Sequence, residues 1–521
     1  MKTHLLVIDA GTGSGRAVIF DRDGHQIGFA QEEWKHLPEA GVPGSMGFDV
    51  EAGWALLRRC IGNALDRCGL TGADIAAVSA TSMREAIVLY GENGKEVWAV
   101  ANVDSRAVAE VRELKARAPG YEQSFYDISG ETFALGALPR LNWLRKHQSA
   151  TFAKVRSISM INDWIGARLT GEITVEPTNG STNGLLDLAT RDWSDALISK
   201  AGLDRSWFPR VVEPGEVVGH VTAAAAADTG LAEGTPFVAG GGDVQMGALG
   251  VGLVGMGEAA VLGGTFWQQV VNIPTGLVDE TMRLRVNSAA LPRMNQAEAI
   301  SFFVGLTARW FRDAFCQEEI RLAAEQGRDA YELMEELAMQ VPVGAHGIIP
   351  VFSDAMDFGH WYHAAPSFLN LSIDPAIANK GSMFRAIQEN AAIVAAVNLG
   401  RVEAFAKVDA SGPLTLAGGA SKGRLWPQIV ADVTGREIRI PVVREATALG
   451  GAAAAATGIG QFATLAEAGS GFVKWERTVE PDLANKPIYD EARSRWEKAY
   501  RAQKALVDDK ITTSLWSAPG T

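Results

Sequence analysis

The first thirty residues alternate between apolar runs and breaks rich in glycine or aspartate, which predicts three β-strands in a meander. The expected strands are 5–9, 16–20 and 26–31, with a turn at Asp21-Arg22-Asp23-Gly24. The first strand ends in Asp9, and the loop after it carries the hydroxyls of Thr12 and Ser14. Such a bend gathers an acid, hydroxyls and backbone N–H groups, which suits the phosphates and metal of a nucleotide.

Beyond this meander the apolar positions change between helical and strand spacing, which predicts an α/β fold. Helices are expected at 51–68, 380–400 and 425–434, and strands at 75–79, 86–90, 237–239 and 414–418. Residues 157–169 are expected to form a strand followed by a helix, and Gly171 is the expected end of that helix. Residues 259–271 again read as strand, Gly-Thr turn and strand. This weak recurrence predicts two related α/β domains meeting at a cleft, with the boundary near residues 245–258.

Three glycine loops are candidate phosphate or nucleotide contacts. The first, residues 11–15, is followed by the β-favouring Ala17-Val18-Ile19-Phe20, which argues against a dinucleotide-binding loop, because such a loop must open a helix. The second is Gly263-Gly264-Thr265, and the third spans 418–423 between a strand and a helix. Taken alone, a simple turn explains the second loop better, and close helix–strand packing explains the third equally well. Two opposed hairpins, however, could hold a polyphosphate from both sides.

Charged side chains at strand ends are candidates for acceptor chemistry. Asp243 follows a strand and three glycines, where it could accept a hydroxyl proton or cap the next helix. Arg84 and Glu85 lie between two strands and could contact neighbouring substrate oxygens, although a surface ion pair is the commoner explanation. His360 and His363 have the spacing of metal ligands but no third ligand nearby, so they indicate a structured loop.

Composition narrows the class of protein. The chain has 521 residues, which favours two domains over one core, and its formal charge of -13 argues against nucleic-acid binding. Three scattered cysteines indicate reduced thiols rather than disulfides or a zinc site. No apolar run reaches bilayer length, and the Ala-rich stretch 446–460 comes nearest. We therefore expect a soluble cytoplasmic protein that binds neither nucleic acid nor membrane.

Together and in this order, the motifs resemble those of the FGGY carbohydrate kinases. The resemblance runs through Asp9–Arg16, the pair Arg84-Glu85, Gly242-Asp243, Gly263–Thr265 and the loop 418–423, and it covers nearly the whole chain. It implies two actin-like, ribonuclease-H-like ATPase domains flanking a central cleft, at residues 1–250 and 251–521. It also implies ATP-dependent phosphorylation of a small hydroxylated acceptor, with Mg²⁺ as cofactor.

The resemblance further assigns a role to each candidate residue. Asp243 would be the catalytic base, and Arg84, Glu85, Asn102 and Asp243 would contact the substrate. Asp9 and Asp243 would hold Mg²⁺, partly through water. The ATP contacts would be Gly11, Thr12, Gly13, Ser14, Arg16, Gly263, Gly264, Thr265, Gly418, Gly419 and Gly423.

Several stretches, among them 82–85, 101–104, 263–272 and 361–368, narrow the resemblance to a bacterial subgroup. Its members phosphorylate the terminal hydroxyl of 4,5-dihydroxypentane-2,3-dione, an open-chain quorum-sensing signal. Pentulose and glycerol kinases commonly place Trp where this chain has Asn102, whose amide offers hydrogen bonds to a small dicarbonyl.

A pentulose or glycerol kinase is the nearest alternative, and a non-catalytic actin-like nucleotide-binding protein is an alternative of another class. Some family members are controlled by proteins of the sugar phosphotransferase system, so such a protein is an expected candidate partner. The residues leave the oligomeric state open.

Overall fold

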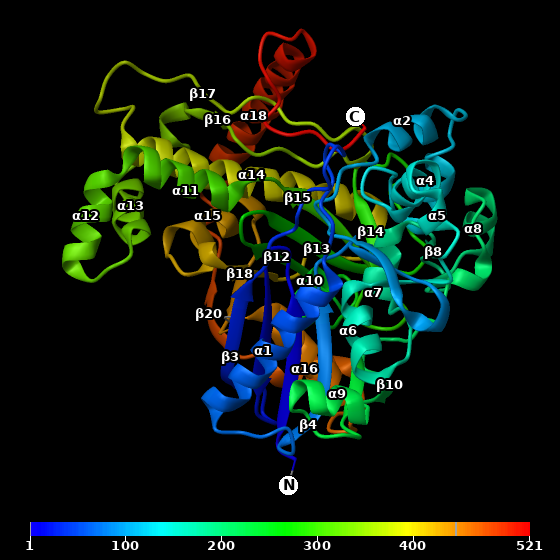
Figure 1. The fold of residues 1–521 in the computed structure, drawn as a ribbon. Helices are drawn as coiled ribbons and strands as arrows, with labels where there is room; N and C mark the ends of the chain where they lie inside the picture. Colours follow the sequence, from blue (N-terminus) through cyan, green and yellow to red (C-terminus); the bar gives the residue numbers. More distant parts are fainter. Residues whose placement is uncertain (1, 443–444, 521) are drawn as a thin grey trace.

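The computed structural model describes residues 2–442 and 445–520, and two large β-sheets dominate it (Figure 1). The first sheet has the order β10-β11-β4-β1-β2-β3. Its strands are β1 (His4–Ala10), β2 (Ser14–Phe20), β3 (Gln26–Glu33), β4 (Ile75–Ser82), β10 (Val217–His220) and β11 (Pro236–Gly242). We call this sheet and the chain up to Gly242 the N-terminal lobe.

The second sheet has the order β14-β15-β13-β12-β18-β19-β20. Its strands are β12 (Ala259–Gly263), β13 (Trp267–Pro274), β14 (Arg285–Ser288), β15 (Met294–Ser301), β18 (Leu414–Gly418), β19 (Ile438–Pro441) and β20 (Trp475–Val479). We call this sheet and the chain from Ala259 onward the C-terminal lobe. Smaller sheets contain β5 (Ile87–Tyr90), β6 (Glu96–Val100) and β7 (Ser157–Met160), then β8 (Leu186–Asp187) and β9 (Asp192–Trp193), and β16 (Ile349–Val351) and β17 (Ser367–Leu369).

The two large sheets repeat one pattern of strand pairing. In the first, β1 pairs antiparallel with β2 and parallel with β4, and β11 continues the parallel set next to β4. In the second, β12 pairs antiparallel with β13 and parallel with β18, which β19 follows in parallel. Each parallel set then ends in an antiparallel edge strand, β10 or β20. The recurrence expected from the sequence is therefore confirmed.

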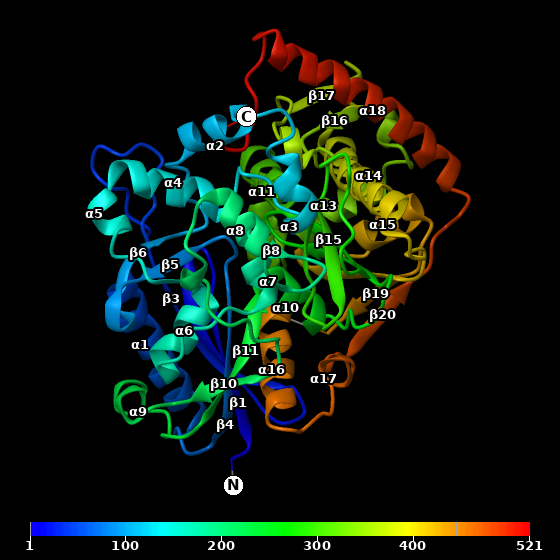
Figure 2. The same ribbon diagram turned by 90° about the vertical axis from the view of Figure 1, so that its right-hand side faces the viewer.

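Helices pack against both sheets and form the outer part of each lobe (Figure 2). They are α1 (Val50–Cys68), α2 (Val108–Ala116), α3 (Gln123–Ser129), α4 (Ala137–His147), α5 (Ser149–Phe152), α6 (Ile161–Thr170), α7 (Pro177–Gly180), α8 (Asp195–Ala201), α9 (Ala223–Thr229), α10 (Asp243–Gly250), α11 (Val304–Phe315), α12 (Gln317–Gln326), α13 (Ala330–Met339), α14 (Lys380–Ala406), α15 (Leu425–Thr434), α16 (Ala446–Gly458), α17 (Leu465–Phe472) and α18 (Lys486–Asp508). None of these helices, within residues 2–442 and 445–520, combines the length and the apolar character needed to span a bilayer.

Most elements expected from the pattern are present, although several begin or end at other residues. The glycines before Asp243 lie inside β11 rather than after it. A side chain at Gly240 would place its Cβ 2.0 Å from the carbonyl oxygen of Ala80, so glycine lets β11 approach β4 closely. The long helix α14 continues to Ala406, and a 3₁₀ turn at Gly419–Ser421 separates the third glycine loop from α15.

Two small-residue helices, α10 and α16, pack against each other between the sheets (Figure 1). Helix α16 comes from the C-terminal half of the chain but packs on the N-terminal sheet, whereas α10 packs on the C-terminal sheet. The two helices touch backbone to backbone, because a Cβ at Gly450 would lie 1.9 Å from the carbonyl oxygen of Met246. The glycines thus let the helices connect the lobes at close range.

Replacing Gly450 tests this contact. We expect Gly450→Ala to lower the free energy of unfolding by about 3 kcal/mol, because the added methyl group forces the helices apart. Gly400→Ala is the matched control, since it also lies inside a helix but has open space around the new methyl group. That control should stabilise the protein by about 0.5–1 kcal/mol. Denaturant unfolding of both variants measures the difference, and equal effects would contradict the packing described.

Candidate active site

Asp243 and the Arg84-Glu85 pair meet at one edge of the N-terminal sheet. Gly242, at the end of β11, is the register partner of Ser82 at the end of the parallel strand β4. The residues that follow both strands therefore lie at the same edge of the sheet, next to the carboxyl ends of the strands, where α/β proteins bind ligands. The Arg84 Nε atom lies 3.5 Å from Asp243 Oδ1. The sequence-predicted base and substrate pair are thus neighbours.

Arg84 and Glu85 are buried, so they are not the surface ion pair that was the alternative. Arg84 pairs through both terminal nitrogens with Glu298 of β15, and its Nη2 lies 2.9 Å from Glu298 Oε1. Glu85 pairs with Arg285 of β14, which also pairs with Glu131. Burial alone would raise the pKa of Glu85, but the positive charges of Arg285 and Arg84 hold it below its usual value. Glu85 therefore stays ionised between two arginines.

The backbone at Glu85 takes an unusual conformation, with a φ of 61°. Its N–H donates to Thr182 Oγ1 at 3.1 Å, and its carbonyl accepts from the Arg140 guanidinium. A left-handed conformation at a residue other than glycine costs free energy and persists where the surroundings fix it. These contacts fix the direction of the Glu85 side chain.

A cavity of about 690 Å³ lies between the lobes above Asp243. Thr12, Arg84, Glu85, Asn102 and Asp243 all line it, and Asn102 Nδ2 donates to Thr12 Oγ1 at 2.9 Å. The C-terminal lobe contributes five aromatic side chains to the opposite wall, together with Gln268, Arg285, Ile300 and residues 517–520. We call this cavity the acceptor cavity, because it brings together all four residues predicted to contact the substrate and the Thr12 hydroxyl of the first glycine loop.

A second cavity of about 420 Å³ lies in the C-terminal lobe and contains the other two glycine loops. The predicted residues that line it are Gly263, Gly264, Thr265, Gly419 and Gly423. Gly263 and Gly418 are register partners in the parallel pair β12–β18, so the loops after these strands lie side by side. Gly418 has a φ of 104°, and a Cβ there would lie 1.7 Å from the Gly263 carbonyl oxygen. It therefore shapes the loop without lining the cavity.

The amino end of α15, which follows the third loop, already holds an anionic group. The Glu335 carboxylate accepts from the backbone N–H groups of Arg424 and Leu425, both at 2.9 Å. The positive end of this helix is thus neutralised by a side chain. The loop offers a ligand its small residues and the space beside them rather than a free helix end.

The remaining candidates of the first loop line neither cavity. Asp9 Oδ2 lies 2.9 Å from Arg16 Nε, which faces it across the β1–β2 pair, and Arg16 also pairs with Glu445. Ser14 Oγ accepts from Gln31 Nε2 at 3.2 Å. Gly11 and Gly13 form the bend, and an added Cβ at Gly13 would meet open space. The loop is therefore accessible for close approach.

Asp9 and Asp243 hold protons more tightly than usual. Burial raises the pKa of Asp9 to about 6, although Arg16 opposes the shift. The Asp243 side chain is 40% exposed, but it faces the cavity between the lobes rather than bulk solvent. Burial, opposed by Arg84 and reinforced by the charges of Glu85 and Asp9, raises the pKa of Asp243 to about 7. A nearby cation would relieve the repulsion between these carboxylates.

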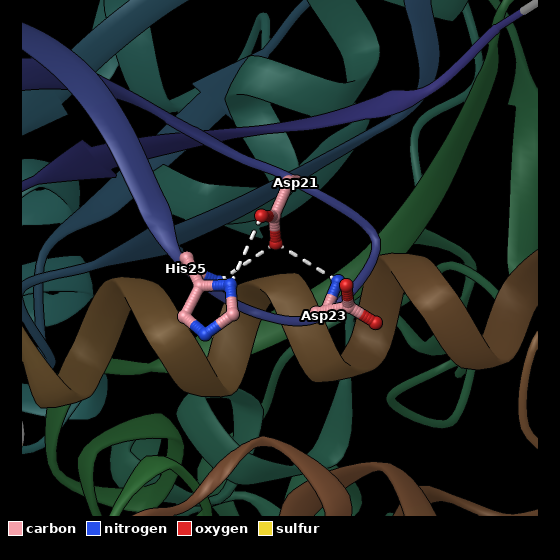
Figure 3. A group of neighbouring side chains, drawn as sticks. All are labelled: Asp21, Asp23 and His25. Carbon is pink, nitrogen blue, oxygen red and sulfur yellow. Dashed lines mark hydrogen bonds and ion pairs between the residues drawn. The ribbon is translucent and has the colours of Figure 1, made fainter.

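Asp21, Asp23 and His25 form a separate group with potential metal ligands, shown in Figure 3. The Asp21 carboxylate already accepts from the backbone N–H groups of Asp23 and His25, both at 2.9 Å, and lies 3.0 Å from His25 Nδ1. These bonds fix the β2–β3 turn expected from the sequence. His363 likewise pairs with Asp354 at 2.8 Å inside the C-terminal lobe, in agreement with the structured loop predicted there.

Sequence reasoning missed four charged residues that complete the site, namely Glu131, Arg285, Glu298 and Glu445. Each lies far along the chain from its partner. None belongs to a glycine motif, and only a charge between small apolar residues of a strand, as at Glu298 between Ala297 and Ala299 in β15, could have drawn attention to them.

Comparison with known proteins agrees with this geometry. The family model described as "FGGY family of carbohydrate kinases, N-terminal domain" matches residues 4–250, and the model for the C-terminal domain matches 274–459. The chain belongs to the FGGY family of carbohydrate kinases. The predicted family and its two-domain actin-like fold are confirmed. An FGGY kinase transfers phosphate from ATP, so the non-catalytic alternative is wrong.

This FGGY kinase has relatives that match it from end to end. It is 53% identical over 519 residues to an autoinducer-2 kinase of Enterobacter sp. (strain 638), which covers 99% of this chain and 98% of that protein. Xylulose kinase from Rhodospirillum rubrum has a TM-score of 0.84 at 23% identity, covering 96% of this chain and 99% of that chain. Plasmodium falciparum glycerol kinase with ADP has a TM-score of 0.81 at 18% identity, and the match covers 96% of this chain and 98% of that chain. The two structures support the fold alone.

The raised pKa of Asp243 predicts the pH dependence of this kinase. A protonated carboxyl cannot accept a hydroxyl proton, so with Asp243 as the base predicted from the sequence, kcat/KM for the acceptor should fall about tenfold per pH unit below about 7. Glu85→Gln removes a neighbouring negative charge and should move this limb to lower pH. Steady-state rates from pH 5 to 9 measure both profiles, and a limb that stays in place in the variant would contradict the assignment.

Proposed function

We propose that this kinase uses ATP to phosphorylate autoinducer-2, 4,5-dihydroxypentane-2,3-dione, at its terminal hydroxyl. The observation that carries the proposal is 53% identity, across 519 residues, to an autoinducer-2 kinase. Asn102 in the acceptor cavity agrees with it, because an amide can hydrogen-bond the oxygens of a small hydrated dicarbonyl. The product would be the phosphorylated signal.

Asp243 would act as the base for the terminal hydroxyl. Its carboxylate, at the start of α10, would accept a hydrogen bond from the hydroxyl and take its proton late in the transfer. Arg84 would donate to the neighbouring oxygens of the acceptor, and Glu85 would accept from its secondary hydroxyl. The ion pairs to Glu298 and Arg285 support these roles, since they hold both side chains before the acceptor arrives.

The nucleotide would occupy the second cavity. Gly263, Gly264, Thr265, Gly419 and Gly423 would line the adenosine and phosphate path, with the third-loop glycines leaving room for the base and ribose. The first loop, with Gly11, Thr12, Gly13 and Ser14, would meet the outer phosphates from the N-terminal lobe. The bond between Asn102 and Thr12 supports this placement, because it joins the acceptor cavity to that loop.

Mg²⁺ fits the carboxylates at the cleft. Asp9 and Asp243 supply the oxygen ligands that this ion prefers, and a bound cation would favour the ionised form of both carboxyl groups, whose pKa burial raises. Asp9 would hold the ion, partly through water, with Asp243 nearby. The bound ion would neutralise charge on the transferred phosphoryl group. Arg16, paired with Asp9, would offset charge from the other side.

Closure of the two lobes would exclude water, which otherwise competes as an acceptor. A cytoplasmic location would supply ATP and a reducing environment, in keeping with the free thiols of Cys60, Cys68 and Cys316. A regulatory protein of the sugar phosphotransferase system stays a prediction from the family resemblance.

Asp243→Asn tests the proposed base. We expect turnover to fall by about three orders of magnitude or more, because the amide neither accepts the proton nor orients the hydroxyl as the carboxylate does. ATP binding, measured by calorimetry, should stay near the wild-type value. Turnover within tenfold of wild type would remove Asp243 from the catalytic role.

A comparison of acceptors tests the proposed substrate. We expect kcat/KM for 4,5-dihydroxypentane-2,3-dione to exceed that for xylulose, ribulose and glycerol under one coupled assay of ADP release. Mass spectrometry of the product should locate the phosphate on the terminal oxygen. A higher kcat/KM for a pentulose or for glycerol would overturn the assignment in favour of that substrate class.

A further inference from the structure

Five aromatic side chains form a continuous wall on the C-terminal side of the acceptor cavity. We define this aromatic wall as Phe266, Phe302, Phe303, Trp361 and Trp516, all of which line the cavity. Phe302 lies at its centre, with ring centroids 4.8 Å from Phe266, 5.1 Å from Phe303, and 4.7 Å from both Trp361 and Trp516. Such distances are those of packed aromatic pairs, so the wall is a preformed apolar surface.

The segment that carries Trp516 is fixed on both lobes. Ala518 N–H donates to the Trp361 carbonyl at 2.8 Å, and His363 N–H donates to the Trp516 carbonyl at 3.0 Å. Gly520 has a φ of 80° and packs so closely on Val111 of α2 that a Cβ would lie 2.4 Å from that side chain. Both views place the carboxyl end of the chain beside α2, well away from α10 (Figures 1 and 2). Residues 516–520 therefore line the cavity from the C-terminal lobe across to α2.

The wall and the polar residues give the cavity two chemically different sides. Asp243, Arg84, Glu85 and Asn102 supply charged and amide groups. The three phenylalanines of the wall offer carbon only, and the Trp361 Nε1 atom is buried. A hydroxyl pressed against these phenylalanine rings would lose its hydrogen bonds to water without replacement, which costs free energy. A methyl group there would lose nothing and would bury apolar surface.

The proposed acceptor has matching ends. Its terminal CH₂OH group would lie at Asp243, its central oxygens at Arg84 and Glu85, and its other end is a methyl ketone. Pentuloses such as xylulose carry a hydroxymethyl group in place of that methyl group. We propose that the aromatic wall, with Trp516 as its closing residue, selects acceptors that end in a methyl ketone over those that end in a hydroxymethyl ketone. This inference rests on the proposed function and adds a physical reason for the choice between acceptors.

Two sugars isolate this selectivity. 1-Deoxyxylulose and xylulose differ only in the hydroxyl group at the end opposite the phosphorylated oxygen. We expect the wild-type kcat/KM to favour the deoxy sugar by about 10- to 100-fold, the range that an apolar pocket achieves against an added hydroxyl. Trp516→Gln should reduce this ratio at least fivefold, because its amide can hydrogen-bond the extra hydroxyl group. Trp516→Phe should keep the ratio within twofold of wild type.

Leu515→Ala is the control for disturbance of the segment, since Leu515 is 40% exposed and does not line the cavity. It should leave the ratio unchanged, and thermal unfolding should show that all three variants are folded. A wild-type ratio near one, or an unchanged ratio in Trp516→Gln, would overturn the inference. The outcome is separable from the proposed function, which fails only if 4,5-dihydroxypentane-2,3-dione is not the preferred acceptor.

Discussion

Two buried ion pairs between the lobes hold the acceptor site together. Arg84 of the N-terminal lobe pairs with Glu298, and Glu85 pairs with Arg285, both partners lying on neighbouring strands of the C-terminal sheet. Removing one partner of a buried pair leaves an uncompensated charge, at a cost of about 3–5 kcal/mol. The residues that would contact the acceptor therefore depend on the second lobe for their charge balance. The site exists as a unit only where the two lobes meet.

The repeated fold carries different side chains at corresponding positions of the two lobes. At the end of β1, Asp9 faces Arg16 across the hairpin, whereas the corresponding end of β12 has Gly263 facing Trp267. The first hairpin therefore concentrates charge near the acceptor cavity. The second leaves space, which forms part of the second cavity. The two related lobes thus differ at corresponding hairpin positions, where one has an ion pair and the other has glycine.

The close contact between α10 and α16 links this arrangement to catalysis. Asp243 is the first residue of α10, so the position of the proposed base depends on a helix that packs between both sheets. Glycines at the contact allow an approach that any larger side chain would prevent. A rigid base and a cavity that spans both lobes suit a reaction that needs alignment of two substrates and exclusion of water.

The sequence by itself determined the elements, the recurrence and most of the candidate residues, because these depend on local periodicity and on glycines at strand ends. It identified Asp243, Arg84 and Glu85 from their places after strands, and the family resemblance gave their expected roles. It did not identify Arg285 and Glu298, which are ordinary charged residues within strands of the other lobe. Nor did it show that residues 516–520 return to α2 and line the acceptor cavity. Only the tertiary structure decided these points, because charge compensation and cavity shape depend on residues hundreds of positions apart whose proximity no local pattern encodes.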